Sequence, residues 1–159
     1  MVFKDIVAIL ERKFNVELAV VEGTTVFEVA DGDGAGRVRV LVQDESERNR
    51  VLLSADLGEP PPEGSEKLFR TMLEANNLFS GTAGATLALD GRGGTFRLQR
   101  AALPEELAND VDGSLVSFIE TALTWRRAIE DFRPGGDADE PPRDGGSLGP
   151  GAGFGMFPV

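Results

Sequence analysis

Cysteine, histidine and tyrosine are absent from this chain of 159 residues, and there is a single tryptophan. Without cysteine there are no disulfides and no thiolate nucleophile. Without histidine there is no imidazole base and no common ligand for zinc or iron. An enzyme built from this chain would depend on carboxylates, lysine, serine or threonine. These absences favour a binding protein that is not an enzyme and uses no cofactor and no metal.

Long apolar runs are also missing, because no stretch approaches the roughly 18 residues that a membrane-spanning helix needs. Lys4 and Asp5 interrupt the first residues, so the pattern of a signal peptide is not met. We therefore expect a cytoplasmic protein without membrane insertion. Basic residues number 16 against 27 acidic ones, which gives a net charge of −11. Such a surface repels nucleic acid and suits solubility or a basic partner, but it selects no partner alone.

The first third of the chain predicts one helix and three strands. Apolar residues at helical spacing, including Phe3, Ile6 and Leu10, predict a helix over residues 3–14 that packs on its own sheet. Alternating apolar and polar residues follow, separated by short polar connections, as is typical of antiparallel neighbours. The predicted strands span residues 25–30, 37–43 and 50–57.

The loop lengths predict a register in which Ala30 pairs with Arg37 and Gln43 pairs with Arg50. One face then carries a line of core residues, and the other, mostly polar face carries one apolar row. That row requires a cover, which is a helix of the same chain, a second copy or a client peptide. The core line is Phe27, Val40 and Leu53, and the apolar row is Val26, Leu41 and Leu52.

A second helix is predicted over residues 66–79, after a proline-rich connector and with Ser65 as its N-cap. Its apolar residues cover a wide arc, which indicates that the helix touches two surfaces: its own sheet and a second copy of the protein. They form two stripes, one of Leu68, Met72, Ala75 and Phe79 and one of Phe69, Leu73 and Asn76.

The rest of the chain predicts a hairpin, a final helix and a tail. The hairpin turns at Gly91–Gly94, and the last long helix ends near Phe132. Thirteen of the 27 residues from 133 to 159 are glycine or proline, so we expect a flexible, loosely attached tail. Its apolar end, residues 154–159, either docks into a groove or is inert.

Two motifs invite a chemical interpretation that their context does not support. The run from Asp31 to Gly34 begins like a calcium loop, but Ala35 and Val42 stand where further oxygen ligands are required. A hairpin turn is the better interpretation. The neighbouring acids Glu105 and Glu106 suit acid–base chemistry, yet nothing apolar surrounds them in the sequence. A solvated surface is the better interpretation there.

Five short motifs in the second half occur in the order and at the distances seen in a known family. The chain resembles the class I type III secretion chaperones, the Tir chaperone or CesT-like family. Single motifs of this kind are weak, but five in order are fairly specific, whereas the first half agrees only in pattern. The motifs are Leu73–Asn76, Gly84–Asp90, Leu98-Gln99, Leu103-Pro104, and the helix carrying Phe118, Ala122, Trp125 and Arg126.

The resemblance implies an α+β fold: a single domain over residues 1–132, ordered α-β-β-β-α-β-β-α, with a twisted antiparallel sheet packed by helices. It also implies a homodimer, with residues 133–159 outside the domain. Family members use the middle helix for the dimer, which here indicates Leu68, Met72, Ala75 and Phe79. The first helix and first strands hold the client. The candidates for client binding are Val26, Leu41 and Leu52, followed by Phe3, Ile6 and Leu10.

The function implied is that of a non-catalytic chaperone that binds the N-terminal segment of a secreted effector and keeps it competent for export. An alternative is a chaperone-like dimer that regulates another cytosolic protein and has no role in secretion. A third, less favoured class is an enzyme that uses carboxylates alone, and a buried cleft with facing carboxylates would support it.

Overall fold

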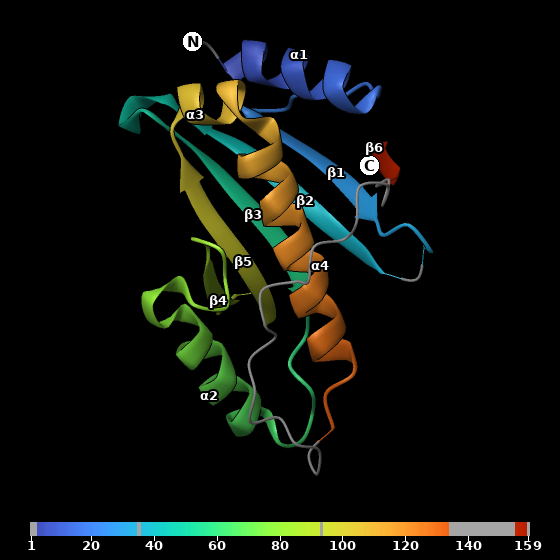
Figure 1. Ribbon diagram of the computed structural model, residues 1–159, viewed down its shortest axis with the longest axis vertical. Helices are drawn as coiled ribbons and strands as arrows, with labels where there is room; N and C mark the ends of the chain where they lie inside the picture. Colours follow the sequence, from blue (N-terminus) through green and yellow to red (C-terminus); the bar gives the residue numbers. More distant parts are fainter. Residues whose placement is uncertain (1–2, 35, 93, 134–154, 159) are drawn as a thin grey trace.

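An antiparallel sheet with helices along one face forms the body of the molecule (Figure 1). The computed structural model describes residues 3–34, 36–92, 94–133 and 155–158. The predicted α+β order is confirmed, with one short helix and one strand in addition. In chain order the elements are α1 (Phe3–Phe14), β1 (Thr24–Ala30), β2 (Arg37–Glu45), β3 (Arg50–Gly58), α2 (Ser65–Asn76), β4 (Thr86–Asp90), β5 (Thr95–Ala102), α3 (Pro104–Asn109), α4 (Ser117–Glu130) and β6 (Gly155–Pro158).

The strands lie in the order β4-β5-β3-β2-β1-β6. The predicted pairing of Ala30 with Arg37 is confirmed. The predicted pairing of Gln43 with Arg50 is wrong by two residues, because β2 continues to Glu45, which lies opposite Arg50. A tight turn follows, in which Asn49 takes the left-handed conformation that asparagine tolerates. Gln43 therefore lies opposite Leu52.

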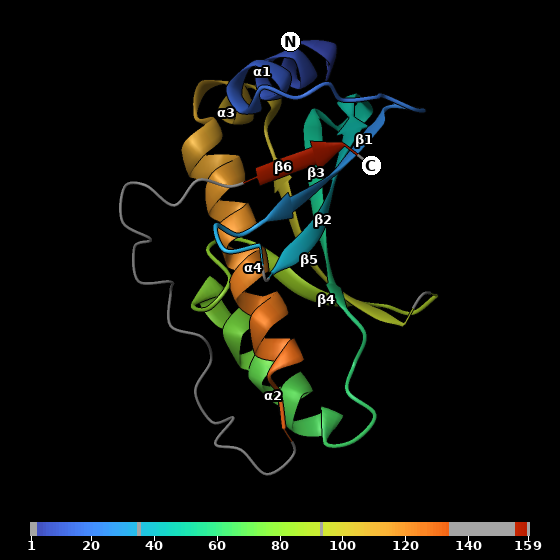
Figure 2. The ribbon, with the colours of Figure 1, turned by 90° about the vertical axis from the view of Figure 1, so that its right-hand side faces the viewer.

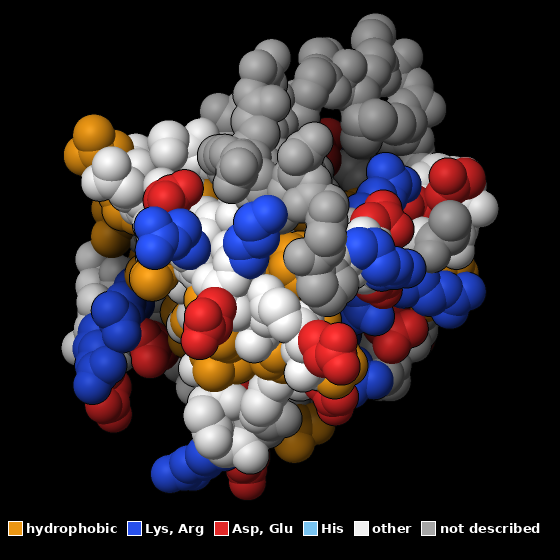
Figure 3. Space-filling view, turned by 90° about the horizontal axis from the view of Figure 1, so that it is seen from below, with side chains coloured by type: hydrophobic (Ala, Val, Ile, Leu, Met, Phe, Trp, Pro, Cys, Tyr) orange, Lys and Arg blue, Asp and Glu red, His pale blue; other side chains and the backbone are white. Residues whose placement is uncertain are grey.

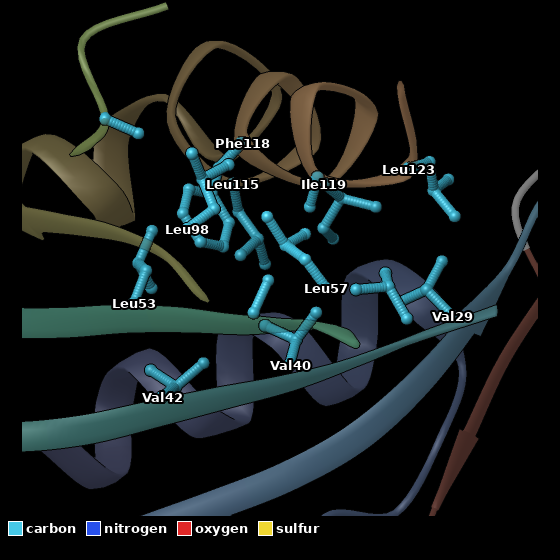
Figure 4. Packing of buried hydrophobic residues seen from close by; sticks show 14 of the residues in the cluster. Val29, Val40, Val42, Leu53, Leu57, Leu98, Leu115, Phe118, Ile119 and Leu123 are labelled. Carbon is cyan, nitrogen blue, oxygen red and sulfur yellow. The ribbon is translucent and has the colours of Figure 1, made fainter. Parts of the chain in front are cut away.

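A shift of two residues keeps every side chain on its predicted face, because the side-chain period of a strand is two. The inner face of the sheet packs against α4 and the π-helical turn that precedes it, Asp112–Val116. Figure 4 shows the side chains of the two layers directed toward each other. Burying one such leucine or phenylalanine contributes about 1.5–3 kcal/mol. The packed residues include Val40, Leu53, Leu57, Leu98, Leu115, Phe118, Ile119 and Leu123.

The other helices lie around α4. Figure 2 shows α4 along one side of the sheet, with α1 and α3 near its upper end and α2 near its lower end. No helix of the described residues is both long and apolar enough to cross a membrane. Gly155–Pro158 forms β6, whereas the remainder of the predicted tail, apart from Arg133, lies outside the described residues.

The predicted helix over residues 66–79 ends earlier than expected, at Asn76. A single 3₁₀ turn follows, in which Leu78 and Phe79 have φ values of 54° and 57°. A positive φ is unfavourable for residues of this size, so these two positions hold local backbone strain. The indole Nε1 of Trp125 donates a hydrogen bond to the carbonyl of Gly81 at 2.8 Å. This contact ties the loop after the strained turn to α4.

Candidate functional site

The outer face of the sheet is the most extensive surface that the helices leave open. Along β1, β2 and β3 the side chains alternate between buried ones on the α4 side and partly exposed ones on the other side. Val26 and Leu41 lie opposite each other on this outer face, as predicted, and both are only half-buried. Two strands thus present adjacent apolar side chains to the surroundings.

Leu52 also lies half-buried on this face, but its position differs from the predicted row. Ser54, and not Leu52, stands opposite Leu41. Because β3 is displaced by two residues, Leu52 is a diagonal neighbour of Leu41, a separation that long side chains still bridge. We call Val26, Leu41 and Leu52 the outer apolar patch.

Charged residues of alternating sign border this patch on one side. In the next row across the sheet Glu28 lies opposite Arg39, and Arg39 lies opposite Asp56. Arg39 and Glu28 form a cross-strand ion pair, with a distance of 3.5 Å between Arg39 Nη2 and Glu28 Oε1. Arg97 follows opposite Asp56 and forms an ion pair with Asp90 at 3.0 Å. The row thus keeps polar side chains in place beside the apolar patch.

The candidate residues of the first helix lie elsewhere. Phe3, Ile6 and Leu10 are buried in the hydrophobic core of the chain itself. This agrees with the expectation that the helix packs on its own sheet. In the single chain these three side chains are therefore not on the surface that a client would contact.

On α2 the structure separates the two predicted stripes. Leu68, Met72 and Ala75 are buried in the chain's own core. The other stripe faces outward, where Leu73 is 70% exposed. Phe69 lies at its margin and contacts Phe96 edge-on, with 5.5 Å between the ring centroids. Only Phe79 of the predicted dimer residues remains exposed.

The outward side of α2 forms a shallow hollow of about 630 Å³, lined by Glu66, Phe69, Arg70, Leu73, Glu74 and Asn77. The exposed side chains of Leu78 and Phe79 follow it directly in the chain. Figure 3 views the molecule from the end at which α2 lies, and hydrophobic side chains appear there between acidic and basic ones. A second apolar surface thus exists, separate from the outer apolar patch.

The two edges of the sheet are each occupied. At the β4 edge, the side-chain amide of Asn76 accepts a hydrogen bond from Leu87 N at 2.8 Å and donates one to Leu87 O at 3.0 Å. At the β1 edge, β6 pairs with Phe27 to Ala30. From the sequence, Asn76 is a member of a family motif and of the second stripe of α2. This role is not predicted, because a contact across 11 residues to a strand edge has no local signal.

The turn between β1 and β2 holds a buried carboxylate. Burial raises the pKa of Asp31, but hydrogen bonding with the side chain of Asp33, with Gly36 N–H at 3.0 Å and with Arg127 outweighs this and lowers the pKa to about 2. A Cβ at Gly36 would stand 2.5 Å from Asp31 Oδ2, so a larger residue at this position would displace the carboxylate. The run predicted as a hairpin turn therefore connects the sheet to α4.

Glu106, one of the two acids considered for chemistry, takes part in a surface contact, and so do two acids that follow it in the chain. Glu106 forms an ion pair with Arg100 at 2.8 Å, and Asp112 forms one with Lys13 at 2.9 Å. Asp110 accepts a hydrogen bond from Gly113 N at 2.8 Å. Among the described residues there is no group of three or more acids that is arranged to hold a metal ion. What the surface offers is apolar area on a sheet face and on a helix, which is a means of binding another polypeptide.

Comparison with known proteins supports the same fold. A chain from the structure of the HopA1–SchA chaperone–effector complex superposes with a TM-score of 0.60 at 20% identity, covering 82% of this chain and 94% of that chain. A chain from the crystal structure of the ExsC–ExsE complex superposes with a TM-score of 0.60 at 19% identity, covering 79% and 91%. No curated protein matches by sequence.

A family profile matches this chain over a longer stretch than the five short motifs on which the family resemblance was based. It covers residues 6–126, from the first helix into α4, and therefore includes the half of the chain in which only the pattern agreed. This chain belongs to the Tir chaperone protein (CesT) family.

Proposed function

We propose that this protein is a non-catalytic, cytoplasmic chaperone that binds the N-terminal segment of a type III secreted effector and keeps it competent for export. Membership of the CesT family carries this proposal. The two solved structures with a similar fold support it, since one is described as a chaperone–effector complex and the other as the ExsC–ExsE complex.

The outer apolar patch is the surface best suited to such a client. It lies on a sheet face that no helix of the described residues covers, and its three side chains are half-buried and therefore accessible. An extended segment can place alternate apolar side chains on it while its other side chains face the solvent. Since ordering a segment opposes binding, a contiguous apolar contact is needed to offset that loss of entropy.

The substitution Leu41→Asp tests this assignment. It places a charge at the centre of the patch while leaving the opposite core face intact, so we expect the free energy of unfolding to fall by no more than about 1 kcal/mol. Client capture should weaken about tenfold, because burial of one leucine contributes about 1.5 kcal/mol. Thr86→Asp, an exposed position at the far side of the same face, is the matched control.

The measurement is affinity capture from a lysate of the native host with the full chain and both variants, followed by mass spectrometry and binding assays with the purified partner. A partner that is secreted, and whose N-terminal segment alone binds, supports the proposal. A captured partner that stays in the cytosol would instead support the chaperone-like regulator. Equal binding by the native chain and by Leu41→Asp would exclude the patch as the client site.

We further propose that the protein is a homodimer and that the outward side of α2 forms the interface. Three of the predicted residues, Leu68, Met72 and Ala75, are enclosed by the chain's own core. The interface is therefore expected to consist of three adjoining exposed residues, Leu73, Leu78 and Phe79, together with the half-buried Phe69. Leu73 and Leu78, which are 70% and 87% exposed, would both gain from such a cover.

Sedimentation of native and variant chains tests the interface. Leu73→Glu should yield a folded monomer, because two carboxylates would be brought together at the centre of the contact. Leu103→Glu replaces another exposed leucine, at the start of α3, and should remain dimeric. Met72→Glu is less informative, since burying a charge in the core unfolds the chain. A dimer that persists in Leu73→Glu would disprove this interface.

A further inference from the structure

The last strand of the chain occupies the edge strand of the sheet. β6 pairs antiparallel with β1, with Phe157 opposite Glu28 and Gly155 opposite Ala30. Figure 2 shows β6 beside β1, although the two strands are far apart in sequence. The sequence is compatible with two outcomes for the C-terminal end, docking into a groove and inertness. The structure places residues 155–158 in the sheet.

The position of β6 suits the backbone chemistry of this edge. Asp31 donates its N–H to the carbonyl of Gly36 in the β1–β2 turn, and hydrogen-bonded positions alternate along an antiparallel strand. Phe27 and Val29 therefore direct their backbone groups toward β2, while Glu28 and Ala30 direct theirs toward β6. Pro158 lies opposite Phe27. The missing N–H of proline is thus placed where the ladder does not require one.

The contact between β6 and β1 is short, and part of it is exposed to solvent. The ring of Phe157 is 47% exposed and lies 5.7 Å from the guanidinium of Arg37. Thr24 is bridged by Val21 at the other end of β1. Within the described residues, Val26 has no strand partner on this edge. A longer strand from another chain would therefore pair with more of β1 than β6 does.

The same edge borders the outer apolar patch. Val26 belongs to both, since it follows directly along β1 from the residues that pair with Gly155–Pro158 and its side chain lies beside Leu41. Phe157 lies opposite Glu28 and therefore on the same face of the sheet as the patch. A strand added at this edge would continue that face outward by one strand.

We propose that the β1 edge is a binding site for an extended apolar segment and that β6 occupies it in cis as a competitor. This inference rests on the proposed function for the identity of the natural ligand, the client segment of an effector. The client adds as a strand to β1, displaces Gly155–Pro158 and extends onto Val26. The tail thus covers an edge that would otherwise attract other chains, and it selects for clients that bind better than the tail.

Competition of this kind has a measurable size. If the tail occupies the edge nine-tenths of the time, the apparent dissociation constant of a competing segment is raised about tenfold, because only a tenth of the protein is competent to bind. Covalent attachment favours the tail, since it gives an effective concentration on the order of millimolar. A short strand with one exposed ring is therefore able to compete.

The test uses full-length chains that differ at one backbone position. Phe157→Pro removes the N–H that faces Glu28 together with the ring, so β6 should leave the edge. Met156→Pro is the matched control, because residue 156 lies opposite Val29 and its N–H faces away from β1. Amide hydrogen exchange should become faster at Glu28 and Ala30 in Phe157→Pro and stay unchanged at Phe27 and Val29.

The binding arm uses a fluorescent peptide with the sequence of residues 151–159. We expect it to bind Phe157→Pro about tenfold more tightly than the native chain, with Met156→Pro close to native. The same peptide carrying proline at position 157 should not bind either protein. Equal affinity for native chain and Phe157→Pro, or equal amide exchange at Glu28 in the two, would overturn the proposal.

These results are independent of whether an effector is found. If no secreted client is captured but the peptide and exchange results are as expected, the proposed function fails and the peptide site remains. If a client is captured and binds the native chain and Phe157→Pro with the same affinity, competition by the tail is disproved while the chaperone function stands.

Discussion

The two edges of the sheet are closed by different means. At the β4 edge, one side chain of the folded body, Asn76, satisfies both backbone groups of Leu87. At the β1 edge, a separate strand from the end of the chain does so. A side chain held between α2 and β4 cannot leave without loss of packing, whereas a four-residue strand can. The difference indicates that the β4 edge is held by the folded body at Leu87, whereas the β1 edge is available for exchange.

Removal of the Asn76 amide should have the largest effect on stability. Asn76→Ala leaves the N–H and carbonyl of Leu87 without their partners in a half-buried site, which we expect to lower the free energy of unfolding by about 2 kcal/mol. Urea unfolding measures this. Asn77→Ala, at the exposed neighbouring position, is the control and should lie within about 0.5 kcal/mol of native. A cost below that limit for Asn76→Ala would mean that water replaces the amide at this edge.

The turn that follows β1 is anchored to the folded body, and this anchor does not depend on β6. Asp31 has a pKa of about 2 in the folded chain, against 3.8 when unperturbed. Its contribution to stability is therefore complete above pH 3.8 and is lost as the pH falls through about 2. Since Arg127 is half-exposed, we expect about 1–2 kcal/mol, below the value that the full shift would give.

Unfolding of native chain and Asp31→Asn as a function of pH measures this contribution. The native chain should be more stable at pH 7, and the two curves should converge between pH 4 and pH 2. Asp33→Asn, which alters a carboxylate at the more distant position, should produce a smaller change. Parallel curves over this range would show that the contact does not stabilise the turn.

Several features of the fold followed from local patterns, and the failures have physical causes. The β1–β2 register was predictable because a polar glycine-rich turn separates two clearly alternating strands. The β2–β3 register was not, because Glu45 and Arg50 lie on the open face, where charged residues are compatible with a strand. Polarity therefore did not mark the end of β2.

The candidate surfaces were predictable only as alternatives. Periodicity indicated that α2 has two apolar stripes, but it did not reveal that Met72 faces the core while Leu73 faces outward. That distinction depends on where the sheet lies. The roles of Asn76 and Phe157 depend on contacts with strand edges that are distant in sequence. A single amino-acid sequence contains no periodic pattern that indicates such contacts.

Opening the β1 edge should cost less stability than removing the Asn76 amide. Phe157→Pro removes one cation–π contact and a short ladder at the surface. Because occupancy of the edge for nine-tenths of the time corresponds to a tenfold equilibrium, we expect the free energy of unfolding to fall by about 1.4 kcal/mol. The same substitution is expected to change peptide binding about tenfold. A destabilisation clearly larger than this value would instead make β6 an integral strand. An integral strand cannot exchange with a client without unfolding the sheet, so this one comparison decides whether the edge is a site or a part of the core.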